Sequence, residues 1–109
     1  MVIDYKEEEK MMEINKVLDG EKAVLLVSGR LDTTTAPELE TTVLNIIGQV
    51  KDLTFDFKDL EYISSAGLRV LLMAVKRIDS NGNMVITNCN DEIMEIFEVT
   101  GFSDVLNIQ

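Results

Sequence analysis

The sequence lacks histidine and has a single cysteine, and each of these scarcities excludes a class of protein. Without histidine there is no imidazole base, so Ser/His/Asp triads and histidine-bearing metal sites are excluded. The lone thiol, Cys89, excludes an internal disulfide and any multi-cysteine zinc site. We interpret Cys89 as a small residue at a strand end and not as a redox sensor. Most enzyme chemistry therefore has no residues to carry it out.

Basic residues are also scarce, with 10 Lys plus Arg against 20 Asp plus Glu, a formal net charge of -10. Acidic residues outnumber basic ones in both halves of the chain, so the acidity belongs to the whole domain. Sequence-independent binding to nucleic acid needs the opposite sign of charge. The composition therefore predicts that nucleic acid is not a partner.

Long apolar runs are missing too. The longest, Val70 to Val75, is far shorter than the roughly 20 residues that span a bilayer. The acidic run Glu7 to Glu9 is the reverse of the basic start of a signal peptide. We expect a polar lead-in over 1–11, one domain over 12–109, no membrane insertion and a cytoplasmic location.

Hydrophobic patterns predict a set of strands. Broken alternation over 12–18 predicts an edge strand that ends at the turn Asp19-Gly20. The continuous apolar run Ala23 to Val27 predicts the central strand, buried on both faces. Alternation over 53–57 and the run 84–87 predict two more strands.

Two longer helices are predicted between these strands. Thr35 to Glu38 has the pattern of a capping box, with the Thr hydroxyl and the Glu side chain serving the first backbone N–H groups. The first helix has the apolar stripe Ala36, Leu39, Val43, Ile46, Ile47 and Val50. The second runs from Ser65 to Asp79 with Gly82 placed to end it. Its predicted core stripe is Leu68, Leu71, Leu72, Val75 and Ile78.

A third helix and a last strand complete the expected fold. Asn90 is placed to cap the helix, and Gly101 is placed to stop it. The apolar residues over 105–108 predict a short last strand. The order β-β-α-β-α-β-α-β predicts an α/β fold with an α+β-like mixed sheet, mostly parallel at its centre, with the helices packed on it.

The segment Tyr62 to Arg69 is the most unusual in the sequence, because two hydroxyls are followed by two very small residues where a helix begins. Small residues permit close approach by another backbone, and unpaired N–H groups favour an anion. A purely structural alternative is that Ser64 caps the helix and Ala66-Gly67 lets it pack tightly on the sheet. The Gly-rich spacing and the lysine of a Walker motif are absent. Spacing alone leaves both interpretations open.

Leu60 to Leu72, together with Gly29 to Asp32 and Val99 to Phe102, resembles a STAS domain of the bacterial anti-sigma factor antagonist type. The resemblance extends from about Met12 to Ile108. The Ser-Ala-Gly-Leu core at 65–68 is its most specific part.

This resemblance implies a switch that binds proteins. In the family, the unphosphorylated antagonist binds an anti-sigma factor that is also a serine kinase, and a sigma factor is released for transcription. The kinase then phosphorylates the antagonist, and a metal-dependent serine phosphatase resets it. Aligned on Gly67-Leu68, the phosphoacceptor falls on Ser65. Many members have Asp immediately before the acceptor, where this chain has Ser64, so Ser64 is the alternative acceptor.

The resemblance also implies a partner surface and implies no catalytic residue, metal or cofactor in this chain. The expected partner-binding residues are Asp32, Thr33, Thr34, Ser64, Ser65, Ala66, Gly67, Arg69 and Met73. Helical spacing places Ser65, Arg69, Met73 and Lys76 on one face of the second helix. Two alternatives stay open: Asp32 as a loop or cap residue, and Arg69 with Lys76 as solvated surface.

Two other functions compete with this one. STAS domains also serve as structural or nucleotide-sensing modules of transporters and sensory complexes, and co-purification with a membrane transport complex would favour that role. A hydrolase using Ser64 or Ser65 would need a base, and no motif links Lys58 or Lys76 to these serines.

Overall fold

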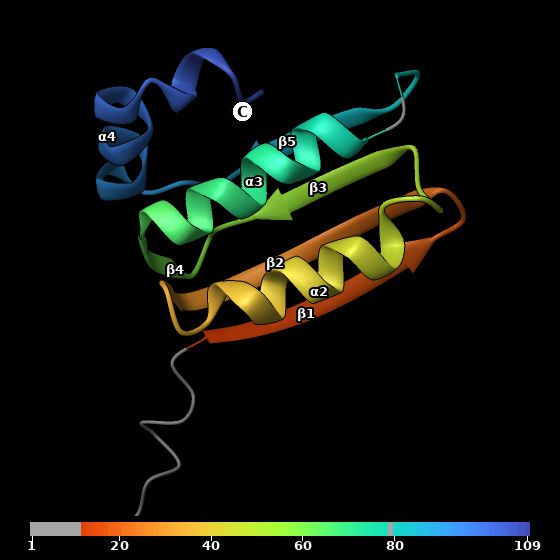
Figure 1. Ribbon diagram of the computed structural model, residues 1–109, viewed down its shortest axis with the longest axis horizontal. Helices are drawn as coiled ribbons and strands as arrows, with labels where there is room; N and C mark the ends of the chain where they lie inside the picture. The colour runs from red at the N-terminus through yellow and green to blue at the C-terminus, as the bar shows by residue number, and fades with distance from the viewer. Residues whose placement is uncertain (1–11, 79) are drawn as a thin grey trace, which may run out of the picture.

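A five-stranded mixed sheet forms one layer of the structure, and two helices lie side by side across it (Figure 1). The computed structural model describes residues 12–78 and 80–109, so the predicted lead-in over 1–11 lies outside the described residues. The strands are β1 (Met12–Asp19), β2 (Lys22–Leu31), β3 (Asp52–Asp56), β4 (Leu60–Ile63) and β5 (Asn83–Thr87). The helices are α2 (Ala36–Ile46), α3 (Ser65–Arg77), α4 (Asp91–Thr100) and the 3-10 helix η1 (Phe102–Asp104).

Strand β2 is the centre of the sheet, as its apolar run predicts. It pairs with β1 antiparallel, with β3 parallel over Lys22–Leu26, and with β4 parallel over Gly29–Leu31. The register between β2 and β4 shifts between Gly29 and Arg30, so the pairing of these two strands is irregular there. The carboxyl ends of β2 and β4 therefore lie side by side, and the segments that follow them meet at one edge of the sheet.

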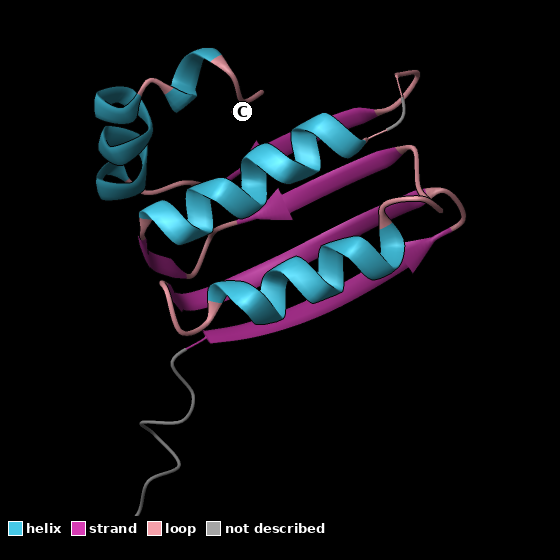
Figure 2. Cartoon of the chain, viewed as in Figure 1, coloured by secondary structure: helices cyan, strands magenta, loops and turns pink. Residues whose placement is uncertain are grey.

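Only one face of β2 is buried. Ala23, Leu25 and Val27 are buried, whereas Leu26 points to the other face and is 37% exposed. The prediction that this strand is buried on both faces is wrong, because α2 and α3 cover the same face of the sheet (Figure 2).

The core lies between the sheet and these two helices. All six residues of the predicted α2 stripe are buried, and so are the alternating residues Leu53, Phe55 and Phe57. In α3, Leu68 and Leu71 are buried as predicted, and Ala74 joins them. The other three residues of the predicted stripe, Leu72, Val75 and Ile78, are only half-buried. Gly67 and Val70 are buried as well, so the buried side of α3 includes residues outside the predicted stripe.

The predicted cap of α2 and the predicted stop signal of α3 are not found in the structure. Thr35 precedes α2, but its side chain makes no capping hydrogen bond; its hydroxyl turns back into the preceding loop. Helix α3 ends at Arg77 with Ile78 in an extended conformation, well before Gly82. The loop that leads back to β5 therefore begins earlier than the glycine suggests.

The order of the elements also differs from the prediction. Leu60–Ile63 forms β4, a strand that sequence patterns did not separate from the following loop. The predicted last strand over 105–108 is reduced to a single parallel bridge between Ile86 and Ile108. Asn90 and Gly101 bound α4 as predicted, with Gly101 in the left-handed conformation (φ 83°). The fold class, a mixed-sheet α/β domain, is confirmed.

Candidate partner-binding site

The loop between β2 and α2 is ordered by its own side chains. One carboxylate oxygen of Asp32, Oδ1, accepts hydrogen bonds from the Thr34 hydroxyl (2.8 Å), the Thr34 amide (3.0 Å) and the Thr35 amide (3.2 Å). The Thr35 hydroxyl accepts from the Asp32 amide (2.8 Å) and donates to the Arg30 carbonyl oxygen (2.8 Å). The geometry favours the loop interpretation of Asp32. Thr33 and Thr34 remain exposed at the tip.

These hydrogen bonds set the charge state of Asp32. The bond from the Thr34 hydroxyl is the largest cause that lowers the pKa of this carboxyl below its ordinary value; burial opposes it, and the Thr34 and Thr35 donors add to the lowering. Arg30 lies beside it, with Nε 4.0 Å from Asp32 Oδ2 and the guanidinium carbon 4.5 Å from the centre of the Tyr62 ring. Arg30 therefore links the loop to β4.

The N-terminus of α3 has no side-chain cap. Ser64 occupies the cap position in an extended conformation (φ -99°, ψ 178°), but its hydroxyl accepts no hydrogen bond from the first turn. Its Oγ is buried and has no hydrogen-bond partner among the described residues. The structural alternative, in which Ser64 caps the helix, is wrong. The first N–H groups of α3 have no partner within the helix, and the Ser64 side chain does not supply one.

Ser65 is the first residue of α3 and is exposed, whereas Ala66 is half-buried and Gly67 is buried. A Cβ on Gly67 would lie 2.7 Å from Leu31 Cγ and 2.8 Å from Ile63 Cγ1. Such distances are far below van der Waals contact, so only glycine permits this approach. The prediction that Ala66-Gly67 packs the helix tightly on the sheet is confirmed at Gly67.

A backbone hydrogen bond joins the two halves of the site. The Ser64 amide donates to the Leu31 carbonyl oxygen at 2.8 Å, so the start of α3 is held beside the strand end that leads into the Asp32 loop. The expected partner-binding residues from 32–34 and from 64–67 therefore lie at the same edge of the sheet.

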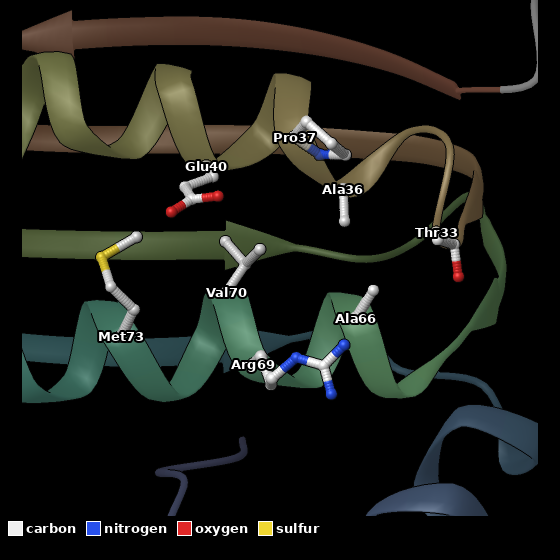
Figure 3. A pocket seen from close by; sticks show the side chains of 8 residues that line it. All are labelled: Thr33, Ala36, Pro37, Glu40, Ala66, Arg69, Val70 and Met73. Carbon is white, nitrogen blue, oxygen red and sulfur yellow. The ribbon is translucent and has the colours of Figure 1, made fainter.

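A groove of about 290 Å³ runs between α2 and α3 from this edge (Figure 3). It is lined by Thr33, Ala36, Pro37, Glu40, Ala66, Arg69, Val70 and Met73. Thus this groove is lined by four of the expected partner-binding residues, Thr33, Ala66, Arg69 and Met73. Met73 is half-buried and packs against the core, instead of standing fully exposed on the helix surface. The alternative that Arg69 is solvated surface stays open, since its side chain is exposed at the rim.

Sequence reasoning missed the contribution of α2 to this groove. Ala36 and Glu40 point from α2 toward α3, as Figure 3 shows, and Pro37 also lines the groove. Ala36 and Glu40 are four residues apart, so helical spacing could have placed Glu40 above Ala36 at the edge of the buried stripe. What spacing could not supply is the neighbour, because it does not show that α2 and α3 lie side by side.

Outside this site, reactive groups are few in the described part of the chain. Cys89 is half-buried, and burial raises the pKa of its thiol to about 11. The thiol is therefore protonated at neutral pH, which favours its structural interpretation. Within residues 12–78 and 80–109, no cluster of three or more His, Cys, Asp or Glu side chains could hold a metal ion. No helix in the same ranges is long and apolar enough to cross a bilayer.

The structure combines a mixed sheet covered by two helices with an exposed serine at the start of α3 and a groove beside it. We next compared this arrangement with known protein families. The STAS domain model matches residues 12–109, and the chain belongs to this family. Among curated relatives, the anti-sigma-B factor antagonist of Listeria monocytogenes is 30% identical over 86% of this chain and 84% of its own length. The resemblance to STAS domains of the anti-sigma factor antagonist type is confirmed.

Solved structures show the same fold. An anti-sigma factor antagonist from Mycobacterium paratuberculosis matches with a TM-score of 0.82 at 19% identity, covering 89% of this chain and 84% of the other. The Bacillus cell fate determinant SpoIIAA, in its phosphorylated form, matches with a TM-score of 0.69 at 17% identity, covering 90% of each chain. At these identities the likeness shows the fold alone.

Proposed function

We propose that this chain is an anti-sigma factor antagonist, which in its unphosphorylated form binds a kinase-type anti-sigma factor in the cytoplasm and so releases a sigma factor for transcription. Membership of the STAS family and relatives named anti-sigma-B factor antagonist support this role. The chain is then a binding protein and a substrate, and the catalysis belongs to its kinase and to a serine phosphatase. The absence of histidine agrees with a chain that supplies no general base.

The partner surface in this proposal comprises the Asp32–Thr34 loop, the start of α3 and the groove beside it. The groove offers apolar surface from Ala66, Val70 and Met73, with the charged Glu40 and Arg69 at its sides. An apolar centre with a polar border is the usual composition of a protein interface. Met73 suits such a position, because its unbranched thioether side chain adapts to irregular surfaces.

The observation that carries the proposal is the exposure of Ser65 at a helix start that its cap residue, Ser64, leaves without a side-chain hydrogen bond. A phosphate on Ser65 would add about -1.5 to -2 charges there. Within the chain this charge is tolerated, because free N–H groups and the positive end of the helix dipole favour an anion. In a closed interface the same charge would lose its water, which is costly. Phosphorylation can therefore end binding without unfolding the domain.

Burial distinguishes the two candidate acceptors. A kinase must align the serine oxygen with the γ-phosphate of ATP, so the hydroxyl has to be accessible. Ser65 is exposed as it stands, whereas Ser64 Oγ is buried and would have to rotate out from beneath the start of α3. This supports Ser65 as the acceptor and leaves Ser64 as the residue that shapes its surroundings.

The direct experiment incubates the chain with its cognate kinase-type anti-sigma factor and ATP, then maps the phosphate by mass spectrometry. The cognate kinase is sought among the neighbouring reading frames. We expect one phosphate per chain on Ser65, loss of that phosphate in Ser65→Ala, and retention in Ser64→Ala. Ser103→Ala, which alters another exposed serine, is the matched control and should be phosphorylated normally.

Two outcomes would reject parts of the proposal. Phosphate on Ser64 in the wild type would move the acceptor by one residue and keep the antagonist role. No binding to the kinase in either phosphorylation state would reject the role itself. Co-purification with a membrane transport complex would then favour the alternative of a structural or nucleotide-sensing module.

A further inference from the structure

A second groove lies between β4 and α4, separate from the groove that α2 and α3 form. It has a volume of about 340 Å³ and is lined by Glu61, Tyr62, Glu92, Glu95, Ile96 and Val99. Helix α4 stands at the end of the sheet where β4 leads into α3 (Figure 1). Tyr62 is only two residues before Ser64, so this groove adjoins the proposed partner surface without sharing its residues.

Three of the residues that line this groove, Tyr62, Ile96 and Val99, offer apolar surface to solvent. Val99 is 76% exposed and Tyr62 is 37% exposed, while Ile96 is half-buried against the core. A single exposed valine needs no explanation, but an exposed valine, an isoleucine and a tyrosine around one hollow form a surface that a partner side chain can fill.

The rim of the groove is acidic. Glu61, Glu92 and Glu95 are exposed, and none of them forms an ion pair with another described residue. Every charged residue of α4 is acidic. Arg30 lies over the Tyr62 ring, but its ion-pair partner is Asp32. The three glutamates of the groove have no ion-pair partner among the described residues.

We infer that this groove binds a basic amphipathic helix of a partner protein, with an apolar side chain seated between Tyr62 and Val99 and with Lys or Arg facing Glu61, Glu92 and Glu95. Charge complementarity selects this occupant, since an apolar anchor with acidic or neutral flanks would leave three carboxylates unpaired. A second copy of this chain is disfavoured, because copies with a net charge of -10 repel each other. The inference does not depend on phosphorylation of Ser65.

The probe is a synthetic, amidated helical peptide of about 18 residues, with Leu along one face and Lys on both flanks. Titration into ¹⁵N-labelled protein should shift the amide signals of Tyr62, Ile96 and Val99 first. A peptide with Glu in place of Lys is the control and should produce no such shifts. Binding of the Lys peptide should weaken as salt is raised, because exposed ion pairs are screened.

Two variants separate the groove from the general acidity of the domain. Glu92→Lys with Glu95→Lys should weaken peptide binding at least about tenfold. Glu13→Lys with Glu21→Lys alters the net charge equally at exposed positions away from the groove, and should weaken binding less than about threefold. Val99→Ser should also weaken binding, whereas Val105→Ser, at another exposed valine, should not.

Equal weakening by both charge-reversal pairs would overturn the inference, since the attraction would then come from the whole domain. Shifts confined to the α2–α3 groove, or no shifts at all, would overturn it as well. Sedimentation that reveals dimers broken by Val99→Ser would assign the groove to a second copy and reject the partner helix. Circular dichroism of each variant shows whether α4 is retained.

Discussion

Helices α3 and α4 begin in almost the same way, and the difference between their first turns is informative. Ser64 and Asn90 both sit at the cap position in extended backbone. Asn90 Oδ1 accepts from the Ile93 amide at 2.8 Å, its Nδ2 donates to the Leu60 carbonyl oxygen at 3.0 Å, and acidic residues fill the first turn. Ser64 makes no such bond, and no acidic residue follows it in the first turn.

This contrast shows two ways to fix the start of a helix. At α4, local hydrogen bonds and favourable charges satisfy the N–H groups, so little remains for an incoming anion. At α3, tight packing of Gly67 on Leu31 and Ile63 fixes the helix instead, and the N–H groups stay open beside Ser65. The end that lacks a cap is the one where a phosphate would be received.

The largest effect is expected from removing the tight packing at α3. In Gly67→Ala the new Cβ would overlap Leu31 and Ile63. We therefore expect the free energy of unfolding to fall by about 1–3 kcal/mol, although Ala normally favours helices. Gly48→Ala is the matched control, because nothing lies within 4 Å of its Cβ. Urea denaturation measures both. Equal stability of the two variants would show that the close approach does not fix α3.

The next effect is expected from removing the cap of α4. Asn90→Ala loses the bonds to Ile93 and Leu60, and should lower the free energy of unfolding by about 1–2 kcal/mol. Asn45→Ala, at an exposed position within α2, is the control and should change it by less than about 0.5 kcal/mol. If thermal denaturation shows no difference between these variants, the cap does not stabilise α4.

The start of α2 gives a third, smaller case, in which Asp32 orders the preceding loop. Its pKa is lowered in the folded state, chiefly by the Thr34 hydroxyl, so the carboxylate stabilises the fold above about pH 4 and loses this effect as the pH falls. The free energy of unfolding should therefore fall less between pH 6 and pH 3 in Asp32→Asn than in the wild type. The difference should be roughly 1 kcal/mol at most. Asp104→Asn, whose carboxylate accepts no hydrogen bond among the described residues, is the control in urea titrations at each pH. Parallel pH profiles for Asp32→Asn and the wild type would contradict this role.

The smallest effect is expected at Ser64. Its hydroxyl is buried and has no hydrogen-bond partner among the described residues, so Ser64→Ala removes an unsatisfied group and should leave the free energy of unfolding unchanged or raise it by less than about 1 kcal/mol. Set beside Asn90→Ala, it tests whether the two helix starts differ as described. A loss as large as that of Asn90→Ala would mean that Ser64 does stabilise α3.

Apolar periodicity predicted the elements that bury a whole stripe of residues. It failed where burial depends on which other elements pack against a strand or helix. The α2 stripe and the alternation in β3 were confirmed, since burial of these residues follows from their spacing. Strand β4 was missed, because four residues give too short a pattern to separate a strand from a loop. The exposed face of β2 could not be predicted either, since it depends on α2 and α3 lying on one side of the sheet.

The candidate site was predictable in its residue types more than in its geometry. Two serines and two small residues mark the start of α3, but the sequence cannot show that the Ser64 hydroxyl is buried and that Ser65 is exposed. The apparent capping box at Thr35 was misleading for a similar reason. The Thr35 hydroxyl forms hydrogen bonds with the backbone of Arg30 and Asp32 in the loop, and not with the helix that follows.

A phosphate on Ser65 should end binding while the fold stays intact. Titration calorimetry should compare the affinity of the cognate kinase-type anti-sigma factor for the unphosphorylated chain and for the chain phosphorylated on Ser65. We expect affinity to fall roughly 100-fold or more, since a buried, unpaired charge in an interface costs several kcal/mol. Equal affinity of the two forms would contradict the claim.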